Sequence, residues 1–337
     1  GRAVSKERVV LTMVERRIDD FLVVSTNKGL SKRTVQNYQH TLLLMLKYLN
    51  EIGVVEEKQI TADTMRDYMR YLKQRGKYTV VINEQSRIRN NPRNRTDIGK
   101  EIQPSTINGM LKNLRAFFNW MVEERIIKEC PIKSSMFIKT DRKPLNFVSD
   151  DAFQALINDL DITVFAEFRD KIIIQLLLDT GMRIGECLAI RVTDLKIEEK
   201  TIFLPAEHTK GRKDRYVFFG TKMARQLKRW LEYKDRTHET DLLFCNRNGN
   251  PLIVNQFDAN IQKYCKRIGL DGIHPHTFRN NFAKRFLMNG GDIYTLSKIL
   301  GHSSVKITEQ AYLDLTTQDL QKQYQNFSPL NRIKSYY

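Results

Sequence analysis

Apolar residues recur every three or four positions through most of residues 1–130, which is the spacing of amphipathic helices. Ser31 and Thr61 stand directly before two of these runs as suitable N-caps, and Pro104 opens a third. We therefore predict a helical domain in this half of the chain. The apolar positions of its first run are Val35, Tyr38, Leu42, Leu46 and Leu49.

The second half of the chain has a mixed pattern. Ser149 can cap a helix, and a long apolar helix then ends at Gly181, a residue suited to the left-handed turn that closes helices. Two strand-like runs, 200–205 and 215–219, flank a lysine-rich turn, and helical spacing resumes after them. This order predicts a second domain that is mainly α-helical with a small β-sheet.

Two stretches interrupt these patterns. Residues 131–148 are polar, basic and punctuated by proline, which indicates an interdomain linker. Residues 73–100 hold eight basic and two acidic residues and are expected to form an irregular loop. This loop is equally consistent with a solvated disordered segment and with a flexible arm that grips phosphates. The helical domain, linker, second domain and tail are expected at residues 1–130, 131–148, 149–316 and 317–337.

The charge of the chain adds a class of partner to this picture. Its 337 residues carry a formal net charge of +17. Residues 1–143 hold 28 Lys and Arg against 16 Asp and Glu, a net of +12, whereas residues 144–337 hold 28 against 23, a net of +5. An excess this large favours a polyanion, and nucleic acid is the first expectation. A merely soluble basic surface is the alternative.

The cysteines and the hydropathy exclude other classes. The four cysteines are widely spaced and form no CxxC pair, so neither a zinc site nor a disulfide framework is expected. No apolar run of roughly 18 residues and no signal peptide occurs, which predicts a cytoplasmic protein. The sequence opens with Gly1 rather than Met, which suggests a tag remnant or a truncated start.

Several polar residues of the second half could carry chemistry. Arg183 follows the helix-ending glycine, and Glu186 could orient its guanidinium through a charge-assisted hydrogen bond. Pro275 favours a helix start, which would place His276 and Arg279 on one face. Each signal also has an ordinary structural explanation, such as a surface Arg–Glu pair. The turn between the two strands carries both Lys210 and Lys213, and the local sequence does not choose between them.

Taken together, these side chains suit chemistry on a phosphodiester without a metal. Arginines would neutralise the charge that develops on the non-bridging oxygens. A histidine would take the proton of an attacking phenol such as Tyr312, since the unperturbed pKa of a phenol is about 10. A lysine could protonate the leaving 5′-oxygen, and the tyrosine would form a covalent phosphodiester.

Three segments and a closing tyrosine resemble the motif boxes of the tyrosine recombinases, or phage-type integrases. The segments are TGMRIGECLAIRVTDL, HTKGRKDRYVFF and HPHTFRNNFAKRFLMNGGDIYTLSKILGH. The stretch SKRTVQNYQHTLLLMLKYL is similar to the core-binding domain of that family, so the resemblance covers about residues 15–320. One departure is Asn280, where the family often has His or Arg. The residues matched to catalytic positions are Arg183, Lys210, His276, Arg279, His302 and the nucleophile Tyr312, with Glu186 as a supporting acid.

The resemblance implies a two-domain, C-shaped clamp around double-stranded DNA that needs no cofactor. It implies strand exchange through a covalent 3′-phosphotyrosyl intermediate, in a tetramer on two paired sites, for integration or excision of a mobile element. Such an enzyme would work at the bacterial nucleoid, with accessory DNA-bending or directionality factors as further partners. The basic residues expected to contact DNA are Arg87, Arg89, Arg93, Arg95, Lys139, Arg142, Lys143, Arg212 and Lys213.

The sequence leaves other functions open. The same chemistry without pairing of two sites would be a type IB-like topoisomerase, and the same strand exchange could resolve chromosome dimers. A DNA-binding module with a decayed active site is the third alternative. The tail would dock on a neighbouring protomer or pack on its own domain, and helical spacing does not decide between these. Unless the start is truncated, we expect too few residues there for the extra arm-site domain of some integrases.

Overall fold

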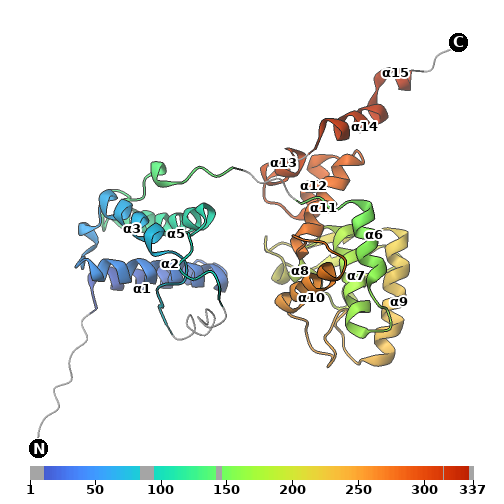
Figure 1. Ribbon diagram of the computed structural model, residues 1–337, viewed down its shortest axis with the longest axis horizontal. Coiled ribbons are helices and arrows are strands. Elements are labelled where there is room, and N and C mark those ends of the chain that lie inside the picture. Colours follow the sequence, from blue (N-terminus) through green and yellow to red (C-terminus); the bar gives the residue numbers. More distant parts are fainter. Residues whose placement is uncertain (1–10, 84–94, 142–145, 314, 334–337) are drawn as a thin grey trace, which may run out of the picture. The chain divides into compact units, whose positions relative to one another are not determined.

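The computed structural model describes residues 11–83, 95–141, 146–313 and 315–333. It divides into two compact units, Gly1–Arg142 and Lys143–Tyr337 (Figure 1). Both are built mainly from helices, and the second also holds a small sheet, as the sequence predicts. Within the described parts of the chain, no helix combines the length and apolar character needed to cross a membrane.

Unit 1 is a helical domain with capped helices. The Ser31 hydroxyl accepts the Thr34 N–H at 3.2 Å, and the Thr61 hydroxyl accepts the Thr64 N–H at 3.2 Å, so both predicted N-caps are confirmed. The predicted start of the irregular stretch, residue 73, is wrong, because the helix that begins after Thr61 continues to Arg75. The helices are α1 (Met13–Asn27), α2 (Lys32–Glu51), α3 (Ala62–Arg75) and α5 (Pro104–Glu123), with short 3-10 turns η1 (Glu57–Gln59) and η3 (Ser134–Met136).

The core of unit 1 forms where the apolar faces of these helices meet. Leu42 and Leu49 of α2 pack with Leu111 and Phe117 of α5, and all four are fully buried. The first part of the predicted linker joins this core. Residue Ile132 is buried there, and the Asn108 side chain holds the backbone N–H and C=O of residue 138 at 2.9 and 2.8 Å. The linker boundaries 131 and 148 remain sequence-based expectations.

Unit 2 surrounds a helix that is buried on nearly every side. This helix, α7 (Phe165–Thr180), buries Ile172, Ile173, Leu176 and Leu177 completely and packs against α9 and α11 (Figure 1). The other helices are α6 (Asp150–Asp159), α8 (Ile184–Leu188), α9 (Thr221–Thr237), α10 (Val254–Arg267), α11 (Pro275–Met288), α12 (Ile293–Leu300), α13 (Val305–Leu313), α14 (Thr317–Phe327) and α15 (Pro329–Arg332).

A three-stranded antiparallel sheet accompanies these helices. Its order is β1 (Leu195–Lys196), β2 (Thr201–Leu204) and β3 (Arg215–Phe218), and Ile202 pairs with Val217. The sequence predicts β2 and β3 but not β1, because a strand of two residues leaves no alternating pattern. The β2–β3 connection is the lysine-rich turn, which contains the short 3-10 turn η5 (Ala206–His208).

The tail helix α14 touches its own unit along one edge. The Lys284 ammonium on α11 lies 4.0 Å from the Asp319 carboxylate, and the Phe327 ring lies 3.3 Å from the place a Cβ would take on Gly290. Even so, Leu320 and Tyr324 are 44% and 57% exposed, so an apolar stripe of α14 remains open to solvent.

The turn at Gly181 gives a direct test of the fold. Gly181 has φ +70°, and a Cβ there would lie 2.2 Å from the Phe282 ring. We expect Gly181→Ala to lower the free energy of unfolding by about 2 kcal/mol or more, because a left-handed alanine and overpacking add. Urea unfolding measures this. The matched control is Gly185→Ala, where a Cβ meets no atom within 4 Å. Equal midpoints for the two variants would contradict the assigned role of Gly181.

Candidate active site

A cavity of about 580 Å³ in unit 2 is lined by five of the candidate residues, which come from four separate segments. Arg183 comes from the start of α8, Lys210 from the β2–β3 connection, His276 and Arg279 from α11, and His302 from the turn after α12. The structure therefore brings together five of the residues that the sequence selects. None of the described residues that line this cavity is acidic.

Arg183 presents an open donor at this cavity. It is the N-cap of α8, directly after the Gly181 turn that closes α7. Its Nη1 atom is buried and has no hydrogen-bond partner among the described residues. Burial lowers the pKa of the guanidinium, and Arg215 lowers it further, while Glu186 opposes both. An unpaired buried donor costs free energy until an acceptor arrives, so the position is suited to an anionic oxygen.

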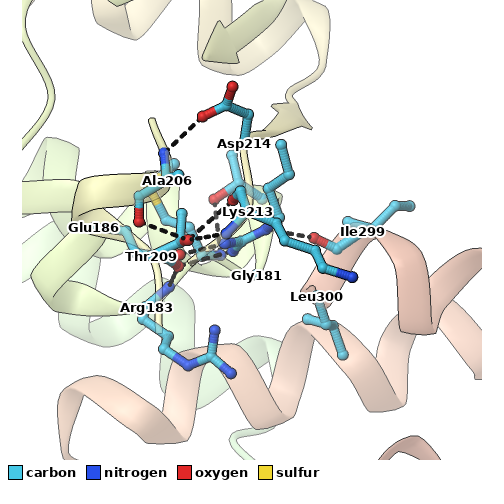
Figure 2. A network of polar contacts seen from close by, with 12 residues as sticks. Gly181, Arg183, Glu186, Ala206, Thr209, Lys213, Asp214, Ile299 and Leu300 are labelled. Carbon is cyan, nitrogen blue, oxygen red and sulfur yellow. Dashed lines mark hydrogen bonds and ion pairs between the residues drawn. The ribbon is translucent and has the colours of Figure 1, made fainter. Parts of the chain in front are cut away.

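Glu186 does not orient the Arg183 guanidinium as the sequence suggests. Its carboxylate accepts the backbone N–H of Arg183 at 2.8 Å (Figure 2). Both Nη atoms of Arg215 also donate to this carboxylate, Nη2 at 2.7 Å. Arg215 Nε also donates to the carbonyl of Ile299 at 3.2 Å. Burial opposes the charge of Glu186, but these bonds outweigh it and hold the pKa of the carboxyl below its ordinary value. Glu186 thus fixes the start of α8 and ties it to β3.

Arg279 is held by the ends of two helices. Its Nη1 donates to the carbonyl of Gly181 at 2.6 Å and its Nη2 to the carbonyl of Leu300 at 2.8 Å. These carbonyls close α7 and α12, and helix C-termini favour positive charge. Burial, reinforced by the nearby Arg183, lowers the pKa of Arg279 to about 9, so the guanidinium remains charged at neutral pH.

Both histidines are neutral at neutral pH. Burial lowers the pKa of His276, and Arg279, Arg183 and Lys210 lower it further. The same causes, burial first and Arg279 next, bring the pKa of His302 down to about 4. His302 contacts Arg279 Nη2 through Nε2 at 3.3 Å and the Thr308 hydroxyl through Nδ1 at 2.8 Å. Neutral imidazoles can accept a proton, which a charged one cannot.

The β2–β3 connection distinguishes its two lysines. Thr209, which is buried, donates from its hydroxyl to the carbonyl of Lys213 at 2.9 Å and accepts the Lys213 N–H at 3.1 Å (Figure 2). Asp214 accepts the Ala206 N–H at 2.7 Å across the same turn. With this backbone fixed, Lys210 lines the cavity and Lys213 does not.

The residues expected to contact DNA are placed unevenly. Arg95 stacks on the Tyr78 ring at 3.7 Å and lies 3.6 Å from Asp97, so part of its charge is already engaged. Lys139, Arg212 and Lys213 are exposed. The remaining ones lie outside the described residues and are Arg87, Arg89, Arg93, Arg142 and Lys143.

Tyr312 lies on α13, and its backbone follows Ala311, which lines the cavity together with Ile307 and Thr308. Asn280, at the position where a basic residue is common in the resembled family, also lines it. His274 stays outside this lining and bonds Asp258 at 3.0 Å instead. Within the described ranges, no group of three His, Cys, Asp or Glu side chains is arranged to hold a metal ion.

Two side chains that matter for this geometry have no distinguishing signal in the sequence. Arg215 reads as one more member of the charged run at the hairpin, and only the fold shows that it joins β3 to α8 and α12. Thr308 reads as an ordinary helix residue, and only the turn after α12 brings its hydroxyl to His302. Both contacts join residues that periodicity cannot relate.

Comparison with known proteins places the chain in a family. The sequence pattern of the phage integrase family matches residues 146–319, and that of the phage integrase N-terminal SAM-like domain matches residues 18–89. Tyrosine recombinase XerC of Listeria innocua is 28% identical over 326 residues, which cover 94% of this chain and 97% of that protein. XerC of Bacillus subtilis is 29% identical over 240 residues, covering 68% and 77%.

Solved structures share the fold. The Tn1549 transposon integrase in complex with a circular intermediate DNA superposes with a TM-score of 0.70 at 15% identity, covering 94% of this chain and 99% of that one. A lambda integrase dimer bound to a core site gives 0.62 at 13% identity, covering 87% and 96%. The chain therefore belongs to the phage integrase family, the tyrosine recombinases. It is a site-specific recombinase enzyme.

The depressed pKa of His302 predicts how stability depends on pH. The folded-state pKa of about 4 lies below the ordinary 6.5, so between these values the unfolded chain binds more protons. Stability is therefore full above about pH 6.5 and falls as the pH drops towards 4. We expect wild type to lose more unfolding free energy than His302→Asn when urea titrations move from about pH 7 to about pH 5. Parallel losses in the two proteins would show that His302 titrates normally.

Proposed function

We propose that this recombinase cuts and rejoins DNA strands through a covalent bond between Tyr312 and a 3′-phosphate. The observation that carries the proposal is the buried Nη1 of Arg183, which has no partner among the described residues, in a cavity whose described charged lining is cationic. An anion with several oxygens would accept a hydrogen bond from Arg183 and balance the positive charge of this site. A DNA phosphodiester supplies that anion, and guanidinium groups recognise phosphate in a fixed geometry.

The proposed step balances within the residues of the site. The Tyr312 phenolic oxygen bonds to phosphorus as the bond from phosphorus to the 5′-oxygen breaks. His276, kept neutral by burial and by Arg279, accepts the phenolic proton, and Lys210 gives a proton to the departing 5′-oxygen. Arg183 and Arg279 neutralise the charge on the non-bridging oxygens. Attack by another strand's 5′-hydroxyl reverses the step and releases Tyr312.

The biological role has two candidates. Integration or excision of a mobile element is one, and resolution of chromosome dimers is the other. Near full-length similarity to recombinases named XerC favours the second. The two roles differ in the DNA that is cut, so covalently trapped genomic fragments distinguish them. Fragments from the ends of an inserted element support the first role, and a chromosomal site in cells without such an element supports the second.

The proposed partners are double-stranded recombination sites and further copies of this chain. Related solved structures contain DNA, which agrees with the first. For the second, the exposed apolar side chains of α14 are available to a neighbouring protomer in a tetramer on two paired sites. The contacts of Asp319 and Phe327 with their own unit hold only one edge of that helix.

Tyr312→Phe tests the nucleophile. Removing the phenolic oxygen removes the atom that bonds to phosphorus, so this variant should form no covalent adduct on a nicked duplex that traps wild type. Denaturing gel electrophoresis of labelled DNA shows the adduct. An adduct with the Phe variant, or none with wild type, would refute the assignment. If wild type only relaxes supercoils and never joins two duplexes, the type IB-like topoisomerase reading replaces recombination.

Arg183→Ala tests the open donor. We expect the rate of adduct formation to fall by about 100- to 1,000-fold, the usual loss when one donor to a developing oxyanion is removed. The matched control is Arg191→Ala, because that arginine is 52% exposed, pairs with Asp241 and does not line the cavity. Single-turnover cleavage of a nicked duplex compares the two. Equal rates for both variants would mean that Arg183 does not face the phosphate.

A further inference from the structure

A buried hydroxyl stands behind one of the cavity histidines. Thr308 on α13 is 1% exposed, and its Oγ1 lies 2.8 Å from Nδ1 of His302. His302 follows α12, so this bond joins the turn after α12 to α13 across Ser303 and Ser304. No other side-chain partner of His302 Nδ1 is recorded among the described residues.

The other nitrogen of the ring fixes the tautomer. His302 Nε2 lies 3.3 Å from Nη2 of Arg279, and a guanidinium can only donate. Nε2 therefore accepts, which places the proton of the neutral ring on Nδ1. The Thr308 hydroxyl therefore accepts the hydrogen bond from Nδ1–H in the DNA-free protein. The direction of the bond follows from donor and acceptor chemistry alone.

A phosphate in the cavity would require Nε2 of His302 to donate a hydrogen bond instead of accepting one. Phosphate oxygens only accept, so His302 can bond one of them only if Nε2 carries the proton. In a neutral ring, Nδ1 then becomes an acceptor and needs a donor. A hydroxyl can serve both states, because it rotates from accepting to donating without moving its oxygen. Valine has the same shape and can do neither.

We propose that Thr308 is the positioning residue that keeps His302 bonded in both tautomers and so lets it change from accepting to donating when DNA enters. The second half of this inference rests on the proposed function, and the first half does not. Threonine suits the role because its branched Cβ restricts χ1 and holds the hydroxyl in place. It also lies one helical turn before Tyr312 on α13, so the same bond ties the nucleophile's helix to the catalytic cavity.

The charges around His302 favour a change of tautomer over protonation. The groups that face it are Arg279 and His276 of α11, Arg183 before α8 and Arg215 of β3, and all lower the pKa of the imidazole in addition to burial. The described charged residues that line the cavity are all cations, so they disfavour a charged imidazolium. The neutral ring therefore responds to an anion by moving its proton between nitrogens, which requires a partner that tolerates both.

Nitrogen NMR of protein labelled with ¹⁵N-histidine tests the first half without any DNA. Protonated and bare imidazole nitrogens have distinct shifts, and His302→Gln identifies the signals among the six histidines. Wild type and Thr308→Ser should show His302 protonated on Nδ1. Thr308→Val should keep the proton on Nδ1, because Arg279 still donates to Nε2, but the Nδ1–H signal should lose the shift of a hydrogen-bonded proton. A wild-type ring protonated on Nε2 in the free protein would overturn the inference.

Cleavage kinetics test the second half. Thr308→Val should slow adduct formation at saturating enzyme by about 10- to 100-fold, the loss typical when the residue that orients a metal-ligating imidazole is removed. Thr308→Ser should recover most of the rate. The control is Thr41→Val, which removes a buried hydroxyl of unit 1 that accepts a hydrogen bond from the Asn113 amide at 3.0 Å. Equal rates for Thr308→Val and Thr41→Val overturn this role of Thr308, whereas failure of wild type to form any adduct would refute the proposed function itself.

Discussion

The structure of the site depends on how one buried charge is stabilised. Arg279 is 3% exposed, and the carbonyls that end α7 and α12 accept both of its Nη groups. A guanidinium out of water is costly unless such acceptors are present. The two helices must therefore end at this point, which explains why both close with a left-handed glycine, Gly181 and Gly301. The position of the Arg279 guanidinium is therefore fixed by where these two helices end.

The remaining positive charges are arranged around that constraint. Glu186 accepts hydrogen bonds from Arg215 and from the N-cap residue of α8, Arg183. It therefore joins β3 to α8 and does not neutralise the cavity. Nη1 of Arg183 has no acceptor among the described residues, and both imidazoles are kept neutral by burial and by the arginines. In the proposed function a DNA phosphate supplies an acceptor for Arg183, so binding and chemistry depend on the same few side chains.

Most of the helices and strands can be predicted from the sequence, but few of the contacts between them can. The caps at Ser31, Thr61 and Ser149 and the stop at Gly181 follow from local rules, because each acts within one turn of chain. Which lysine lines the cavity, Lys210 or Lys213, depends on the hydrogen bonds of Thr209 and Asp214 within the hairpin turn. No local sequence pattern predicts these bonds. The true partner of Glu186, and the bond between His302 and Thr308, join different elements and appear only in the fold.

A structure of Tyr312→Phe bound to an uncleaved duplex would test the central claim most directly. The account predicts the scissile phosphate inside the cavity, with Nη1 of Arg183 about 3 Å from a non-bridging oxygen, the distance of a normal hydrogen bond. Arg279 should share that phosphate while keeping its bonds to the two helix ends. A scissile phosphate outside the cavity, or an Arg183 Nη1 that still lacks an acceptor when DNA is bound, would contradict the account.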